Sequence, residues 1–121
     1  MERLRYFLFL LILTPSVALA ININVFSPVK NSTKTLSCTD ASGSTAVALE
    51  VTGAQLHFYN RGTVPAFVNW GTSTVTAGTG STVVGPGNAL FTRNLESETH
   101  VACRMATGET ATVYVETGYG E

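Results

Sequence analysis

The chain has 121 residues, of which 45% are hydrophobic and 12% charged, and its net charge at pH 7 is −1. A chain of this length corresponds to one domain. Nucleic-acid binding through phosphate neutralisation needs clustered lysine and arginine residues. The basic residues here form no run, which excludes a nucleic-acid-binding protein.

Residues 1–20 have the organisation of a secretory signal peptide. Its parts are a positive start, an apolar stretch, a helix-breaking proline and a small-residue cleavage pattern: Arg3 and Arg5, Tyr6–Leu13, Pro15, and Ala18 and Ala20. Cleavage after Ala20 makes Ile21 the first residue of the mature protein. The alternative is an uncleaved membrane anchor, although the apolar stretch is short for a bilayer span. We therefore predict an exported protein with one domain over residues 21–121.

The mature part has five basic residues, seven acidic residues and only two cysteines, Cys38 and Cys103. Two cysteines in an exported chain are usually paired, so we predict a disulfide that closes a long loop. The alternative is a reactive or metal-binding pair. That pair would lack a Cys-x-x-Cys spacing, and only His57 and His100 could complete a metal site. We therefore expect neither a metal nor a cofactor.

The mature sequence is rich in Thr, Val, Gly and Ser, which favours strands over helices. Short β-type segments are separated by Gly, Asn, Ser and Pro, and no window has sustained helical spacing. The expected strands are Ile21–Phe26, Thr33–Thr39, Ala46–Val51, Ala54–Tyr59, Ala66–Trp70, Thr82–Val84, Ala89–Arg93, His100–Met105 and Glu109–Thr117. This spacing predicts an all-β protein, a single small antiparallel β-sandwich with immunoglobulin-like or jelly-roll-like connections.

Two connections have the sequence of hairpin turns. Asn60–Thr63 separates two strong strand patterns and contains Gly62. Ala106–Gly108 joins the last two strands, with a glycine at a position that tolerates unusual backbone angles. We therefore expect each of these strand pairs to be neighbours in one sheet.

Alternation along the strands separates an apolar face from a polar one. Leu56 and Phe58 share a face, opposite the outward set Gln55, His57 and Tyr59. In the last two strands the predicted inward residues are Val101, Cys103 and Met105, and Ala111, Val113 and Val115. Leu36 and Cys38 fall on one face near the start, so both cysteines lie on apolar faces, as a bridge requires.

Catalytic motifs are missing from the sequence. It has no Gly-x-Ser-x-Gly elbow and no His-Glu-x-x-His helix, and Asp40 is its only aspartate. We therefore expect a protein that is not an enzyme. Trp70 is expected in the core or at its rim, the alternative being an exposed interface aromatic. The candidate interface residues are Gln55, His57, Tyr59, Trp70 and Tyr119.

Three stretches together resemble a known group of proteins. They are Leu56–Gly62 followed by Val64–Gly71, the segment Thr99–Ala102, and Gly108–Val115 before the Gly-Tyr-Gly-Glu terminus. This pattern resembles small β-sandwich proteins encoded among the virion genes of tailed bacteriophages and prophages. The resemblance implies a non-enzymatic, head-decorating or accessory virion protein that is oligomeric.

Two functions follow as expectations. The first is a structural virion protein that forms a homo-oligomer or covers a capsid or envelope surface. The second is an exported periplasmic or cell-surface β-sandwich module for binding or adhesion. The signal-peptide pattern and the cysteine pair favour the second, because tailed-phage particles assemble in the cytoplasm and disulfides need an oxidising compartment.

Overall fold

A computed structural model describes residues 26–41 and 44–119 of the chain. The predicted signal peptide, its cleavage site between Ala20 and Ile21, and most of the first expected strand, Ile21–Phe26, lie outside the described residues. The described residues contain strands and turns and no helix. The predicted all-β sandwich is confirmed.

Nine strands follow one another along the chain. They are β1 (Ser27–Pro28), β2 (Lys34–Cys38), β3 (Val47–Ala48), β4 (Gln55–Asn60), β5 (Ala66–Gly71), β6 (Thr82–Val84), β7 (Ala89–Arg93), β8 (His100–Met105) and β9 (Ala111–Tyr119). The predicted bounds of β6, β7 and β8 are those observed. The segment Ala46–Val51 is wrong in length, since only two of its residues pair. After β3 the chain leaves the sheet edge, where Leu49 N donates to Thr99 O over 2.9 Å.

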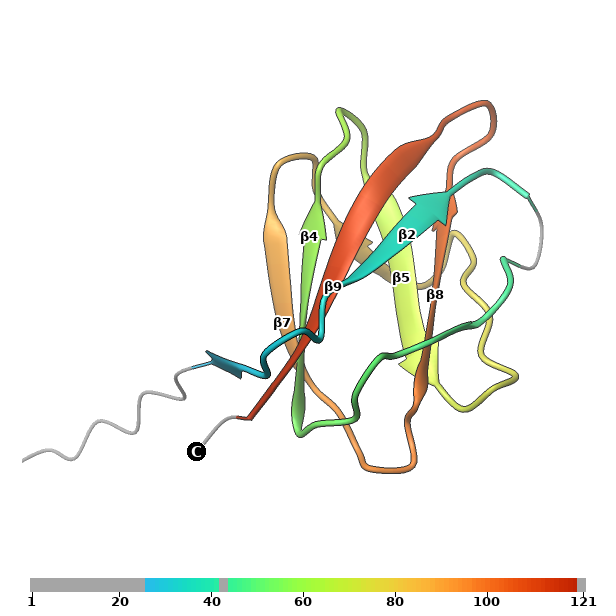
Figure 1. Ribbon diagram of the computed structural model, residues 1–121. Coiled ribbons are helices and arrows are strands. Elements are labelled where there is room, and N and C mark those ends of the chain that lie inside the picture. Colours follow the sequence, from blue (N-terminus) through green and yellow to red (C-terminus); the bar gives the residue numbers. More distant parts are fainter. Residues whose placement is uncertain (1–25, 42–43, 120–121) are drawn as a thin grey trace, which may run out of the picture.

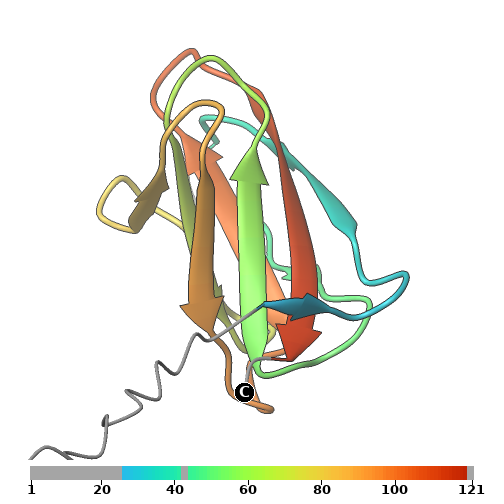
Figure 2. The ribbon, with the colours of Figure 1, turned by 90° about the vertical axis from the view of Figure 1, so that its left-hand side faces the viewer.

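The strands form two antiparallel sheets packed face to face (Figures 1 and 2). Sheet A has the order β1-β9-β4-β7, with β2 also paired to β9, and sheet B has the order β3-β8-β5-β6. The pairs β2–β9, β3–β8, β4–β7 and β5–β6 are nested inside one another along the sequence. Such a folded-over ribbon has the connectivity of a jelly roll. Of the two predicted sandwich types, the jelly-roll type is therefore the one observed.

Both predicted hairpins are wrong, because each turn carries the chain from one sheet to the other. β4 belongs to sheet A and β5 to sheet B, and likewise β8 belongs to sheet B and β9 to sheet A. At the first crossing the fully buried Asn60 donates from Nδ2 to the carbonyls of Val64 and Val84. At the second, Gly108 has φ +81° and donates its N–H to Asp40. These bonds to other segments replace the cross-strand pairing of a hairpin.

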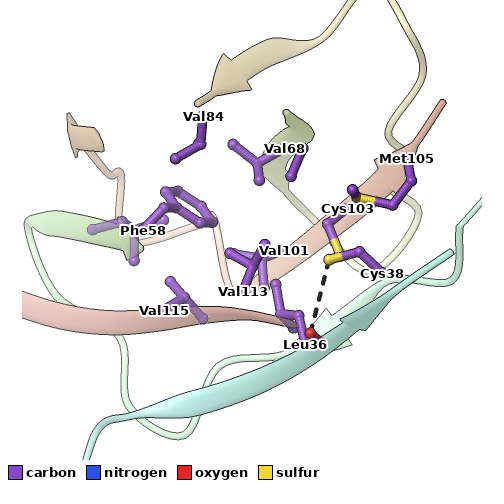
Figure 3. Close-up of a cluster of buried hydrophobic side chains, with 12 residues drawn as sticks. Leu36, Cys38, Phe58, Val68, Val84, Val101, Cys103, Met105, Val113 and Val115 are labelled. Atoms are coloured by element: carbon purple, nitrogen blue, oxygen red, sulfur yellow. Dashed lines mark hydrogen bonds between the residues drawn. A yellow bond between two sulfur atoms is a disulfide. The ribbon is translucent and has the colours of Figure 1, made fainter. Parts of the chain in front are cut away.

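The core lies between the sheets and contains most of the predicted inward residues, together with Ala66, Val68 and Val84, which were not predicted to point inward (Figure 3). Phe58, Val113 and Val115 enter it from sheet A, and Val101 and Met105 from sheet B, all with no exposed surface. Their burial removes apolar area from water, which is the main stabilising term in folding. The alternation assigned the two faces of β4, β8 and β9 correctly.

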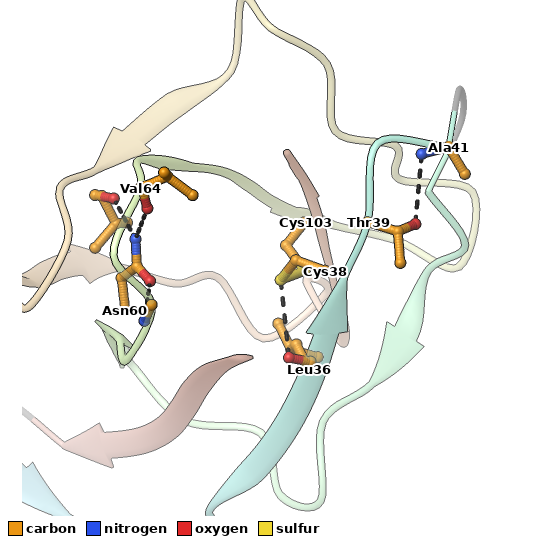
Figure 4. The surroundings of a disulfide bond; sticks show 9 residues. Leu36, Cys38, Thr39, Ala41, Asn60, Val64 and Cys103 are labelled. Atoms are coloured by element: carbon orange, nitrogen blue, oxygen red, sulfur yellow. Dashed lines mark hydrogen bonds between the residues drawn. A yellow bond between two sulfur atoms is a disulfide. The ribbon is translucent and has the colours of Figure 1, made fainter. Parts of the chain in front are cut away.

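The predicted disulfide joins Cys38 of β2 to Cys103 of β8 (Figures 3 and 4). Their Cα atoms are 5.4 Å apart, within the range that a bridge spans. Because β2 and β8 belong to different sheets, the bond links the two layers of the sandwich directly.

Candidate functional site

The outer face of sheet A presents the outward residues of its central strands. Gln55, His57 and Tyr59 alternate along β4 with the buried Leu56 and Phe58. Three of the five predicted interface residues therefore share one face. β4 is held in place by backbone pairing on both sides, with β9 along one edge and β7 along the other.

Three rings from distant parts of the chain meet on this face, and we call Phe26, His57 and Phe91 the aromatic cluster. The His57 ring stacks on Phe91, with centroids 4.4 Å apart and planes inclined by 16°. Phe26 lies 5.5 Å from His57 and 5.4 Å from Phe91. The Phe26 ring lies over Gly118, where a Cβ would be only 2.7 Å from its Cζ. Glycine at position 118 therefore leaves the space that the Phe26 ring occupies.

Polar groups border the aromatic cluster on the β9 side. Glu116 lies opposite His57 in the strand register, and its Oε2 is 3.6 Å from His57 Nδ1. Thr33 donates a 3.2 Å hydrogen bond to Glu116 Oε1. Two residues before Glu116 on β9, the Tyr114 hydroxyl accepts a 2.8 Å hydrogen bond from Arg61 Nη1. These contacts hold side chains that are partly open to solvent in defined positions.

Two hollows flank the stacked His57 and Phe91 rings, each of about 310 Å³. The first is lined by Thr33, His57, Tyr59, Tyr114 and Glu116. The second is lined by Phe26, Gln55, Phe91, Thr92 and Arg93. Both combine aromatic surface with hydrogen-bonding groups. The face can therefore stack on an apolar surface and bond to polar groups beside it.

The other two predicted interface residues lie elsewhere. Trp70 is on sheet B, half-buried against the core, with its ring centroid 5.9 Å from that of Phe58. Tyr119, at the end of β9, is 57% exposed and lines a separate hollow with Asn94 and Leu95. The structure thus brings together Gln55, His57 and Tyr59, and it does not add Trp70 to them.

Sequence reasoning missed Phe26, Phe91 and Glu116 as members of this face. Alternation in β7 does separate Leu90 from Phe91, but nothing in the sequence says which of these two apolar residues points outward. The outward position of Glu116 could be predicted, because this residue alternates along its strand with the inward Val113 and Val115. The position of Phe26 could not be predicted, since it depends on the chain folding back across β9.

A scan against protein-family models and a search of curated proteins found no match to this chain. Among the residues that the structure describes, no helix has the length and apolar character needed to cross a bilayer. Within the same residues, no three His, Cys, Asp or Glu side chains gather as a metal site would require. The resemblance to virion proteins of tailed phages stays a prediction.

Proposed function

We propose that this chain is a non-enzymatic structural protein, an accessory or head-decorating component of a virion that attaches through the outer face of sheet A. The observation that carries the proposal is the aromatic cluster, which stands on a paired and regular sheet instead of inside the core. Phe91 is 58% exposed and Tyr59 38% exposed on that face. Exposed aromatic residues that lie side by side are typical of protein interfaces.

Rigidity of the face supports a role in assembly. His57 and Glu116 are cross-strand neighbours on β4 and β9, and these two strands pair over six residues. Side chains fixed by such pairing lose little freedom when a partner binds, so more of the contact energy remains as affinity. Jelly rolls also occur in viral capsid proteins and in lectins, which agrees with either proposed role by analogy of fold alone.

A second candidate function is an exported binding module of the periplasm or cell surface. The bond between Cys38 and Cys103 favours it, because structural disulfides form in oxidising compartments and are rare in the cytosol. Both candidates use the same face of sheet A. They differ in where the protein resides and in what covers that face.

Fractionation of a producing culture separates the two candidates. Virions, periplasm and medium are resolved on a density gradient and analysed by mass spectrometry for the Cys38–Cys103 peptide and for a peptide beginning at Ile21. Enrichment with particles is the result expected for the virion role. A processed protein found only in the periplasm or medium would reject that role in favour of the binding module.

A pair of variants tests whether the face is the attachment surface. Tyr59→Arg places a charge in the middle of the face, and we expect it to abolish co-sedimentation with particles. Val83→Arg changes a residue that is 53% exposed on β6 of sheet B, and we expect it to co-sediment like the wild type. Equal behaviour of the two variants would mean that the attachment surface lies elsewhere.

A further inference from the structure

Strand β7 forms an edge of sheet A. Within the described residues it pairs with β4 alone, so its other side has backbone N–H and C=O groups with no strand beside them. Figure 1 shows β7 at the margin of the sheet. Natural edge strands usually avoid pairing with other chains by being short, or by carrying proline, a bulge or several charges. The sequence of β7, Ala-Leu-Phe-Thr-Arg, has a single charge and none of the other features.

The remaining edges in the described part of the chain are protected. β1 and β3 have two residues each and β6 has three, so they offer little backbone for pairing. β2 has five residues, and its Lys34 forms a 2.6 Å ion pair with Glu50. Among the edge strands of the described residues, β7 is therefore the one that is five residues long and has no ion pair on its side chains.

We propose that two copies of this chain associate by pairing β7 with β7, antiparallel, about a two-fold axis that passes beside Phe91. In this register Phe91 faces Phe91 of the second copy. Ala89 then faces Arg93, and Leu90 faces Thr92. The two A sheets become one continuous sheet across the axis, and the interface is isologous, as in most homodimers.

The placement of charge favours this register and this partner. Arg93 is the only charged residue of β7, and it lies two residues from the axis. The two Arg93 side chains are then separated by about 14 Å along the strands, which exceeds the Debye length of about 8 Å at physiological salt. Each Arg93 instead faces Ala89, the smallest outward residue, whose neighbour on β4 is Tyr59. The guanidinium can extend over the Tyr59 ring, where a cation–π contact is favourable.

The axis also joins the two aromatic clusters. Phe91 is 58% exposed and already stacks on His57. A second Phe91 directly opposite covers that exposed ring and gives a cross-strand aromatic pair, which stabilises antiparallel sheets. The row Phe26, His57 and Phe91 is thereby continued by the same three rings of the second copy.

The dimer deepens the proposed structural role, and its test is independent of it. Purified full-length wild type, exported so that its disulfide forms, is measured by light scattering after size-exclusion chromatography, with the expected mass twice that of one chain. Phe91→Lys puts two like charges face to face, and we expect it to halve that mass. Val83→Lys, at a residue of similar exposure on β6, is expected to remain dimeric. Thermal melting followed by circular dichroism verifies that both variants are folded.

A crosslinking pair tests the register itself. Directly opposed residues of an antiparallel pair have Cα atoms about 4.5–5.5 Å apart, which suits a disulfide. Phe91→Cys is expected to give a covalent dimer on a non-reducing gel, and Val83→Cys a monomer. A wild type that is monomeric at every concentration, or equal crosslinking by both variants, would overturn the proposal. A monomer that still sediments with particles would reject the dimer and leave the virion role standing.

Discussion

Cys38 and Cys103 connect the two sheets of the sandwich across the core, with their Cα atoms 5.4 Å apart. They are separated by 65 residues, a stretch that holds the five strands β3 to β7. The bridge therefore closes a loop that contains five of the nine strands. A small core gains from such a constraint, because it limits the unfolded chain.

Replacing one cysteine tests this contribution. We expect Cys103→Ser to lower the free energy of unfolding of the exported protein by about 4 kcal/mol, the chain-entropy value for a loop of this length. Urea denaturation gives the difference. Under reducing conditions the wild type should become nearly as unstable as the variant. A variant as stable as the oxidised wild type would show that the bridge contributes nothing.

The faces of the strands could be predicted from the sequence, and the crossings between sheets could not. Alternation needs only local information, so the inward positions of Phe58, Cys103 and Val113 follow from it. The Asn60–Thr63 turn has the composition of a hairpin, yet its direction depends on where the Asn60 amide finds acceptors. One acceptor is the carbonyl of Val84, 24 residues away, which no local pattern indicates.

Asn60 is the buried polar residue that fixes the first crossing. Its Nδ2 donates to two carbonyls, as Figure 4 shows for Val64, and its Oδ1 accepts the Gly62 N–H over 2.8 Å. We expect Asn60→Ala to cost about 3 kcal/mol, since it leaves buried backbone groups without partners. Urea denaturation measures the loss.

Asn69→Ala is the matched control for that variant. The Asn69 amide donates to Thr76 O near the surface, where water can replace it. We expect a loss below about 1 kcal/mol. Comparable losses for the two asparagines would contradict the structural role assigned to Asn60.

Two adjacent residues of β9 test the assignment of its faces. Val113 has no exposed surface, whereas Thr112 is half-buried on the outer face. Val113→Asp places a carboxylate in the core without a partner, and we expect it to prevent folding. Thr112→Asp should fold like the wild type by circular dichroism. If both variants fold, or neither does, the assignment of inward and outward faces to β9 is contradicted.

Part of the candidate site could be predicted from the sequence, again because alternation along a strand needs only local information. Gln55, His57 and Tyr59 alternate with Leu56 and Phe58, two of the largest fully buried side chains, so their outward position follows from local alternation. Phe26 and Phe91 join them through pairing between β4 and β7 and through the return of the chain over Gly118. Those relationships are made by the topology, so they become visible only once the strand order is known.

Gly53 lies where another segment approaches closely, and this gives a further test. A Cβ at this position would overlap the methyl group of Thr117 and lie 2.9 Å from the carbonyl oxygen of Gly118. Thr117 has little room to move, because it is fully buried and its Oγ1 donates to Val51 O over 2.8 Å. We therefore expect Gly53→Ala to lower the free energy of unfolding by about 2 kcal/mol, as overpacking does.

Gly80→Ala is the control for this close approach. No atom lies within 4 Å of the position of its Cβ. Alanine there restricts the unfolded chain without straining the fold, so we expect a change between zero and a gain of about 1 kcal/mol. Parallel urea titrations of the two variants and the wild type decide the matter. If Gly53→Ala is as stable as Gly80→Ala, the chain before β4 does not pack against the end of β9 as described, because only that contact distinguishes the two positions.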